Sequence, residues 1–390
     1  MKGFFLNTFD KGKASVYFLL CLGCVTISFN TAAIAAVIPS ISKDLGISDF
    51  AVSRMISFYM IPYGLGALIY APLLKVISYR KVLASTMLLY AISCALCSIG
   101  NLLNNLLLAR MAMGLSGAAV TPMALMIIGD NFDSNIRGRL VGVFFSCSFF
   151  ASLAGIGIAS FADWRALFYI PALLALVITI VSLLMKSEIF DRSQTGEVNY
   201  IRVFTNKRIR NVFLFIFVIS ALYHGVHQWY GVYLDKVYGL SKQAISLIFI
   251  LSAVGGLVGQ NIGGMLSDKK NRLFACYTGF IVLSLSTLLL SLHFPVIIVA
   301  AVMVFISIGW TISHNGISTL LTDFPEEERA LTASLNSAVR FISGGIGFYL
   351  STYIVASSFA TNFFIIGIVM FILVFLIKYI IISVEHKNGE

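Results

Sequence analysis

Twelve long apolar stretches dominate this sequence of 390 residues. Each contains about 20 residues, and a helix of that length crosses about 30 Å of hydrocarbon. Lipid offers no hydrogen-bond partners to an exposed backbone, so such stretches are expected to span the membrane as helices. The sequence therefore predicts an all-α integral membrane protein. The expected spans are residues 14–38, 51–74, 82–100, 103–129, 140–161, 166–185, 210–234, 243–266, 273–292, 295–320, 331–354 and 360–384.

The composition supports this class and argues against a soluble protein. Hydrophobic residues make up 59% of the chain and charged residues 11%, and the mean hydropathy is +0.93. A soluble domain carries about 25% charged residues. All six cysteines lie inside apolar runs, away from clusters of histidines or carboxylates. We therefore expect the lipid bilayer as a partner and neither a disulfide, a metal site nor a cofactor.

An internal repeat divides the chain in two. In each half an arginine precedes a glycine by sixteen residues, with an offset of 190 between the halves, and a pair of aspartates lies 193 apart. The expected domains are residues 1–185, a basic linker at 186–209, and residues 210–390. A membrane protein built from two related halves has a natural moving part at the seam between them. The repeated pairs are Arg139 and Arg329, Gly155 and Gly345, and Asp130 and Asp323.

The lysines and arginines predict the orientation. With a cytoplasmic N-terminus, 20 of the 27 would lie inside and five outside, a bias that places both termini in the cytoplasm. The net charge of +10 is then a consequence of topology, and no nucleic-acid partner is expected. The first apolar run is too long for the core of a cleaved signal peptide. We expect a multi-pass protein of the inner (plasma) membrane, and nothing in the sequence requires more than a monomer.

Short charged loops carry a family motif. The pattern Gly-x-x-x-Asp-(Arg/Lys)-x-Gly-(Arg/Lys)-(Arg/Lys) is matched after the eighth span at Gly264, Asp268, Lys269 and Arg272. The equivalent loop after the second span departs from it, because Lys75 occupies the acidic position. With its twelve spans in two halves, the whole chain resembles the major facilitator superfamily of secondary transporters.

Two further motifs resemble the drug and metabolite exporters of that superfamily. One is Arg110 followed by Gly114 and Gly117 in the fourth span; the other is the turn at residues 163–165, Asp-Trp-Arg. The glycine-proline signature of these antiporters is largely missing from the fifth span. The resemblance implies two pseudo-symmetric six-helix halves that rock about a central site lined by the first, fourth, seventh and tenth helices.

The loop motif also implies a cytoplasmic latch. An aspartate near a helix N-terminus interacts favourably with free amides and can pair with arginine. A latch of this kind would break when the cavity opens inward, although the same charges could simply anchor loops at the membrane surface. The latch candidates are Asp268, Lys269, Arg272, Asp130, Arg139, Asp323 and Arg329.

Only two charges fall deep inside the spans, Arg110 and Arg340. Charges in the membrane are costly, so each is a candidate functional residue; the alternative for each is an interhelical hydrogen bond to a backbone carbonyl. Asn336 shares a helical face with Arg340, and polar residues also line one face of the first, seventh and tenth spans. A histidine in a wet cavity could carry a coupling proton. The remaining candidate substrate contacts are Asn30, His224, His227, Gln228, His314 and Asn336.

The charges favour one class of substrate. No Asp or Glu lies deep in any span, so two arginines should attract anions and repel cations. We expect proton-coupled export of a small organic solute, anionic or carboxylate-bearing. Alternatives are a multidrug efflux antiporter, an importer or exchanger of organic anions, and a transporter-like receptor that does not transport. No catalytic motif of an enzyme is found.

Overall fold

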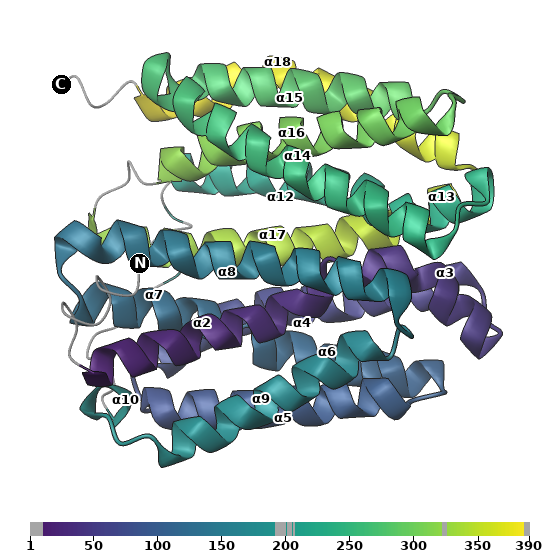
Figure 1. Cartoon of the computed structure of the whole chain (residues 1–390). Coiled ribbons are helices and arrows are strands. Elements are labelled where there is room, and N and C mark those ends of the chain that lie inside the picture. Colours follow the sequence, from purple (N-terminus) through teal and green to yellow (C-terminus); the bar gives the residue numbers. More distant parts are fainter. Residues whose placement is uncertain (1–10, 192–199, 201–204, 206, 322–325, 386–390) are drawn as a thin grey trace. The chain divides into compact units, whose positions relative to one another are not determined.

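The computed structural model describes residues 11–191, 200, 205, 207–321 and 326–385. Within these residues the regular secondary structure is helical (Figure 1). Twelve helices or helix pairs are long and apolar enough to cross a membrane. The predicted fold class and the predicted twelve spans are therefore confirmed.

The chain forms two compact units. The first unit comprises Met1–Ile47 and Arg54–Val198, and the second comprises Ser48–Ser53 and Asn199–Glu390, so the division falls within the segment expected as the linker. The helices of the first unit, together with the first turn of α4 that belongs to the second, are α2 (Lys11–Thr31), α3 (Ile34–Leu45), α4 (Asp49–Leu73), α5 (Tyr79–Ile99), α6 (Leu103–Gly117), α7 (Val120–Asn131), α8 (Ser134–Phe161), α9 (Ala166–Leu184) and α10 (Glu188–Asp191).

The second unit has the same succession of long helices. The helix α10 in the expected linker has no counterpart among them. The helices of the second unit are α12 (Lys207–His227), α13 (Tyr230–Tyr238), α14 (Lys242–Lys269), α15 (Arg272–Leu290), α16 (Val296–Leu321), α17 (Glu326–Val355) and α18 (Phe359–Glu385).

The first and seventh spans are each broken into two helices at related places. The first is interrupted between α2 and α3, and the seventh between α12 and α13. The second piece ends in both cases at a glycine with a left-handed backbone, Gly46 (φ 67°) and Gly239 (φ 62°), a conformation that glycine adopts without steric cost. These glycines lie 193 residues apart, so the sequence repeat is also a structural repeat.

Two of the breaks in the spans have identifiable causes. Between α6 and α7, Pro122 has no N–H to donate to the carbonyl of Ala118 four residues earlier. Between α12 and α13, the carbonyl of Gly225 accepts a buried hydrogen bond from the Asn362 side chain at 3.0 Å. The amide of Trp229 bonds instead to Val226, at 3.1 Å. The breaks therefore follow from lost or diverted helical hydrogen bonds.

Glycines of the fifth and eleventh spans allow close helix packing. A methyl group at Gly155 of α8 would overlap the carbonyl oxygen of Phe29 in α2. A methyl group at Gly347 of α17 would overlap the carbonyl oxygen of Ala221 in α12 in the same way. Close-packing glycines thus lie where α8 approaches α2 and where α17 approaches α12, as small residues do in membrane bundles. Gly347 lies two residues after Gly345, the glycine that the sequence repeat pairs with Gly155.

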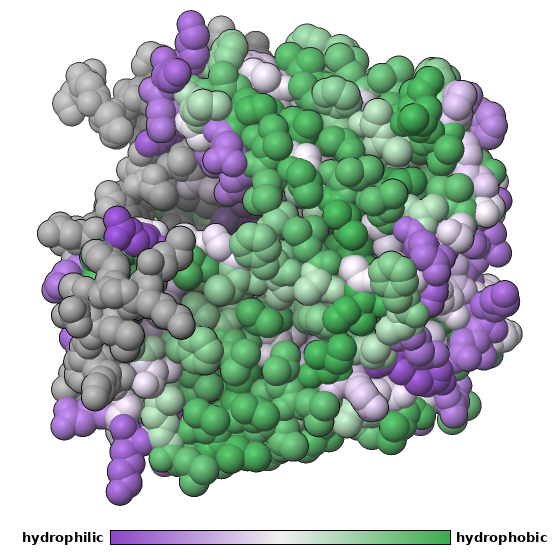
Figure 2. Space-filling model, viewed as in Figure 1, coloured by the Kyte–Doolittle hydropathy of each residue, from purple (hydrophilic) through white to green (hydrophobic). Residues whose placement is uncertain are grey.

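The surface pattern agrees with a membrane location. On the face shown in Figure 2, hydrophobic residues cover the middle of the helices and hydrophilic residues gather near helix ends. Large apolar side chains such as Phe161 (83% exposed) and Leu173 (61%) lie on this type of surface. A soluble monomer rarely exposes apolar patches of more than a few hundred Å², so the chain is a multi-pass membrane protein.

Candidate functional site

The intramembrane arginine of the first unit is sealed inside the helix bundle. Arg110 of α6 is 1% exposed. Its Nε donates to the carbonyl of Met55 in α4 at 3.1 Å, and its guanidinium lies 4.2 Å from the ring centroid of Tyr59. One turn later, a methyl group at Gly114 would overlap the carbonyl oxygen of Tyr59. Gly114 therefore lets α6 approach α4 closely enough for Arg110 to bridge the two helices.

Several buried polar atoms at or near this arginine have no hydrogen-bond partner among the described residues. Asn30 of α2 is fully buried and lies beside the hydroxyl of Tyr90 in α5. Within the described residues, both amide atoms of Asn30, the Tyr90 hydroxyl and Nη1 of Arg110 have no hydrogen-bond partner. Buried polar groups are rarely left in this state. The first unit thus holds a polar cluster, but a densely enclosed one.

An aromatic stack joins two helices of the second unit. The rings of Tyr223 in α12 and Trp310 in α16 stack with centroids 4.0 Å apart and an interplanar angle of 4°. His227 stacks on Tyr223 at 5.2 Å, and His224 meets Trp310 edge-on at 6.2 Å. Offset and edge contacts of this kind are favourable between aromatic rings. Two predicted histidines therefore lie on one aromatic platform.

The second intramembrane arginine lies at the edge of this platform. The guanidinium of Arg340 in α17 is 5.7 Å from the Trp310 ring centroid, and its Nε donates to Oδ1 of Asn336 at 2.8 Å. Ser220 of α12 donates to the Arg340 carbonyl at 2.9 Å, which ties the two helices together. Nη2 of Arg340 has no hydrogen-bond partner among the described residues.

Two further predicted residues complete the cluster. The ring centroids of His314 in α16 and Trp310 lie 5.9 Å apart, and Nδ1 of His314 lies 3.4 Å from the Ser318 hydroxyl. Gln228, at the break between α12 and α13, has Nε2 at 3.3 Å from Nδ1 of His224. Parts of the Arg340, Asn336 and histidine side chains remain accessible. The second unit therefore brings together six of the eight predicted substrate contacts: His224, His227, Gln228, His314, Asn336 and Arg340.

The remaining two predicted contacts, Asn30 and Arg110, lie in the first unit. Sequence reasoning missed the tyrosines that pack around both clusters, Tyr59, Tyr90 and Tyr223. Tyr223 had a signal, because it precedes His227 by four residues and so shares its helical face. As substrate contacts all eight residues stay predictions.

The predicted latch residues lie at helix ends. Asp268 and Lys269 are exposed at the end of α14, and Arg272 is half-buried where α15 begins. Asp130 in α7 and Arg139 in α8 are exposed. Arg329 lies in α17, but its side chain is outside the described residues, as is Asp323 entirely. The latch stays a prediction.

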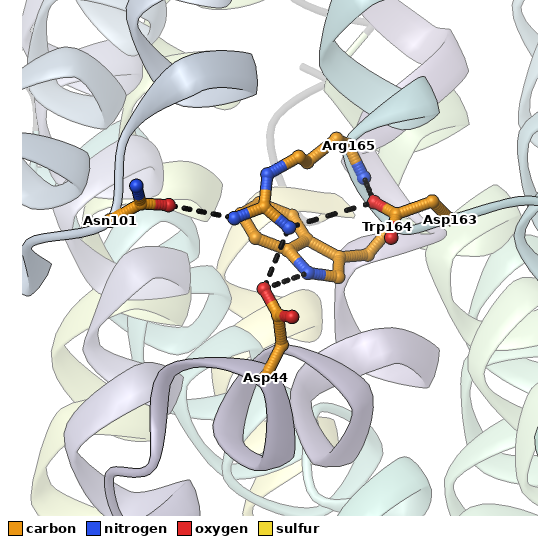
Figure 3. A network of polar contacts seen from close by, with 5 residues as sticks. All are labelled: Asp44, Asn101, Asp163, Trp164 and Arg165. Carbon is orange, nitrogen blue, oxygen red and sulfur yellow. Dashed lines mark hydrogen bonds and ion pairs between the residues drawn. The ribbon is translucent and has the colours of Figure 1, made fainter.

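A polar network at one end of the first unit joins two loops to the end of α3 (Figure 3). Nη1 of Arg165 lies 2.6 Å from Oδ2 of Asp44, and Nη2 donates to Oδ1 of Asn101 at 2.8 Å. Trp164 Nε1 donates to the same Asp44 oxygen at 3.2 Å. The Asp163 side chain caps the turn by accepting from the Arg165 amide at 2.8 Å. The Asp-Trp-Arg turn is thus a clamp on the end of α3.

The clamp has a clear electrostatic signature. The hydrogen bond from the Arg165 guanidinium holds the pKa of the Asp44 carboxyl below its usual range. Asp44 and Asn101 were not among the predicted residues, because charged and polar residues near span ends are common and carry no specific signal. The network stabilises the turn of the exporter-like motif in the first unit.

Comparison with known proteins gives distant relatives with consistent names. Multidrug resistance protein 3 of Bacillus subtilis (strain 168) is 22% identical over 330 residues, covering 68% of this chain and 64% of that protein. Multidrug transporter protein MdtP of the same organism is 27% identical over 198 residues, covering 49% of this chain and 36% of that protein. The chain therefore spans less than two thirds of the length of these curated relatives.

The fold is shared with solved transporter structures. A bacterial homologue of the human lysosomal transporter Spinster, in an inward-facing and unoccupied conformation, superposes with a TM-score of 0.77 at 14% identity, covering 97% of this chain and 98% of that one. The family model of the Major Facilitator Superfamily matches residues 20–348. This match extends over both units and most of the twelve spans, and the chain therefore belongs to the major facilitator superfamily.

Proposed function

We propose that the chain is a secondary transporter that moves a small organic anion across the membrane by alternating access. The observation that carries the proposal is the Arg340 cluster of the second unit. It joins a cationic guanidinium with an unpartnered nitrogen to amide, imidazole and aromatic groups. Such a set of donors suits a carboxylate attached to an apolar body.

Charge selects the substrate class in this proposal. Within the described residues, Arg340, His224 and His314 contact amide, hydroxyl and aromatic groups and no carboxylate. An uncompensated cation at membrane depth is costly, and a bound anion removes that cost. A lipophilic cation would instead add a second positive charge to the cluster. The same guanidinium therefore favours anions and disfavours cations.

The remaining parts of the proposal concern direction and coupling. The distribution of lysines and arginines supports a plasma-membrane protein with both termini in the cytoplasm. His224, His227 and His314 are the candidate carriers of a coupling proton. The exporter-like motifs at Arg110 and at residues 163–165, together with the names of the relatives, support export. A monomer would be sufficient for all these steps.

The test is transport in proteoliposomes under an imposed pH gradient. A panel of aromatic carboxylates is compared with a panel of lipophilic cations of similar size. The proposal predicts gradient-driven movement of carboxylates, lost in Arg340→Gln and retained in Arg210→Gln, a matched exposed arginine on α12. Transport restricted to cations, or carboxylate transport unaffected by Arg340→Gln, would contradict it.

A second candidate is a multidrug efflux antiporter. The aromatic platform of Tyr223 and Trp310 favours it, because ring faces accept flat apolar molecules with little chemical selectivity. The relatives named as multidrug transporters also support it. In the same experiment, this candidate predicts transport of several unrelated cations that falls when Trp310 is replaced by Ala and persists in Arg340→Gln.

A further inference from the structure

A buried asparagine of the last helix lies beside the candidate site of the second unit. Asn362 of α18 is fully buried, and its Nδ2 donates to the carbonyl of Gly225 in α12 at 3.0 Å. Its Oδ1 has no hydrogen-bond partner among the described residues. A half-satisfied amide is destabilising inside a protein, where an apolar side chain of similar size would leave no polar atom unpaired. Stability alone therefore does not explain an asparagine at this position.

This asparagine bonds to α12 where that helix ends. In an unbroken α-helix the Gly225 carbonyl would accept from the amide of Trp229, four residues later. That amide bonds instead to the carbonyl of Val226 at 3.1 Å, and α13 begins only at Tyr230. The Asn362 side chain thus bonds to the acceptor that would otherwise continue the helix, and it keeps the break in place.

The two sides of the break are held by different contacts. On the α12 side, a methyl group at Gly225 would lie 3.1 Å from Cδ1 of Ile366 in α18 and 3.4 Å from the Gly347 carbonyl oxygen in α17. Just beyond α12, Nε1 of Trp229 donates to the Ser351 hydroxyl at 2.8 Å. The chain therefore packs against neighbouring helices both before and after it leaves the α-helical path.

The break also lies within the candidate site. His227, which stacks on Tyr223 at 5.2 Å, is the last residue of α12. Gln228 follows directly, and its Nε2 lies 3.3 Å from Nδ1 of His224. Each residue of an α-helix is turned by about 100° from the one before it. The backbone at the break therefore determines where the Gln228 amide lies relative to the two histidines.

We propose that Asn362 is a positioning residue for substrate binding, which ends α12 next to Gln228 and so holds that amide at the histidines. The role of Asn362 rests on the proposed function, which takes the cluster of the second unit as the substrate site. Without the Asn362 donor, the Trp229 amide is free to bond to the Gly225 carbonyl and to join α12 to α13. Gln228 and the residues after it would then turn away from the aromatic platform.

The first test measures the break itself and needs no substrate. Nitroxide labels are attached at Leu214→Cys in α12 and Val237→Cys in α13, positions that are 58% and 39% exposed, after the six native cysteines have been replaced. One unbroken helix between these positions would span about 35 Å. Asn362→Leu should lengthen the distance measured by pulsed electron paramagnetic resonance toward this value. An unchanged distance would overturn the proposal.

Three further variants separate the lost hydrogen bond from general damage. Asn362→Ala removes the same donor without filling its space, and should also lengthen the distance if Asn362→Leu yields too little folded protein. Asn362→Gln retains an amide donor and should keep the distance of the labelled parent. The matched control is Asn261→Leu, which removes an exposed amide bonded to its own helix at the Leu257 carbonyl. A longer distance in this control as well would contradict a specific role for Asn362.

The second test is transport kinetics in proteoliposomes, with the member of the carboxylate and cation panels that wild type transports fastest. In Asn362→Leu the KM should rise about tenfold at a nearly unchanged maximal rate, as expected for the loss of a binding interaction. Asn362→Gln should restore the KM. A longer distance with an unchanged KM would refute the role in substrate binding. The preference for carboxylates or cations is read from wild type alone, so failure of the anion proposal is a separate outcome.

Discussion

The two intramembrane arginines occupy different kinds of environment in the two units. Arg110 is 1% exposed and bonds to a backbone carbonyl of a neighbouring helix. Arg340 is half-buried, bonds to a side-chain amide, and faces an aromatic platform with three histidines nearby. The two units have the same succession of long helices, but local packing determines how far each arginine is buried and what it bonds to.

This difference separates two roles that look alike in the sequence. A guanidinium bonded to a main-chain carbonyl and covered by Tyr59 braces α6 against α4. Both guanidinium groups have a nitrogen without a hydrogen-bond partner among the described residues, but only Arg340 is partly accessible, and it is therefore available to bind an anion. We therefore expect variants of Arg110 to act mainly on stability and variants of Arg340 mainly on transport.

The largest effect is expected from Arg110→Ala. Removing this buried side chain leaves a cavity and deletes the bridge to Met55, which should lower the free energy of unfolding by about 2–5 kcal/mol. Arg110→Met is the matched variant, because it fills the volume without a buried charge and such replacements are often neutral. Thermal unfolding of the purified protein in detergent measures both. Normal stability with lost transport in Arg110→Met would make Arg110 a substrate contact.

The next largest loss of stability is expected from Gly114→Ala, which tests whether close packing of α6 on α4 lets Arg110 reach Met55. In Gly114→Ala the added methyl group overlaps the backbone of Tyr59, so the helices must separate at a cost of about 1–3 kcal/mol. Gly129→Ala in α7 is the control, since nothing lies within 4 Å of the added carbon. Unfolding temperatures of the two variants should differ clearly. Equal values would mean that α6 and α4 are not in tight contact here.

A smaller effect on stability, but a clear one on activity, is expected from Arg340→Lys. The charge is retained, whereas the planar fork that bonds Asn336 and can hold a carboxylate is lost. Initial rates for a transported carboxylate should fall about tenfold, which corresponds to 1.4 kcal/mol, with the unfolding temperature nearly unchanged. A large loss of stability instead would make Arg340 a structural brace like Arg110.

The smallest effect concerns the clamp at Asp44 of the first unit. Its pKa is lowered by Arg165, so its stabilisation is present above the pKa of the unfolded carboxyl, about 3.9, and is lost as the pH falls through the lower folded value. The pair is 42% and 29% exposed, and its contribution should stay below about 1 kcal/mol. The free energies of unfolding of wild type and Asp44→Asn should differ at pH 6 and converge at pH 3. A difference that is the same at both pH values would exclude the ion pair as its cause.

Much of the fold could be predicted because the bilayer imposes a length. Twelve apolar runs were long enough to span it, and the described part of the chain contains twelve helical segments long and apolar enough to do so. The candidate cluster of the second unit was partly predictable, since His224, His227 and Gln228 share one helical face. Tyr223 shares that face with His227, but the stacking of Trp310 on it could not be predicted, because it depends on how closely α12 and α16 approach.

Hydropathy and residue spacing alone determined the membrane class, the twelve helices and the duplication, because each can be read from the order of residues along the chain. They could not distinguish Arg110 from Arg340, as both are followed by small residues on a helical face. Only the tertiary structure distinguishes them. Gly114 brings α6 against the α4 backbone and encloses one arginine, whereas Trp310 and Asn336 hold the other at the edge of a polar cluster. Distances between helices set that outcome, and a linear pattern does not contain them.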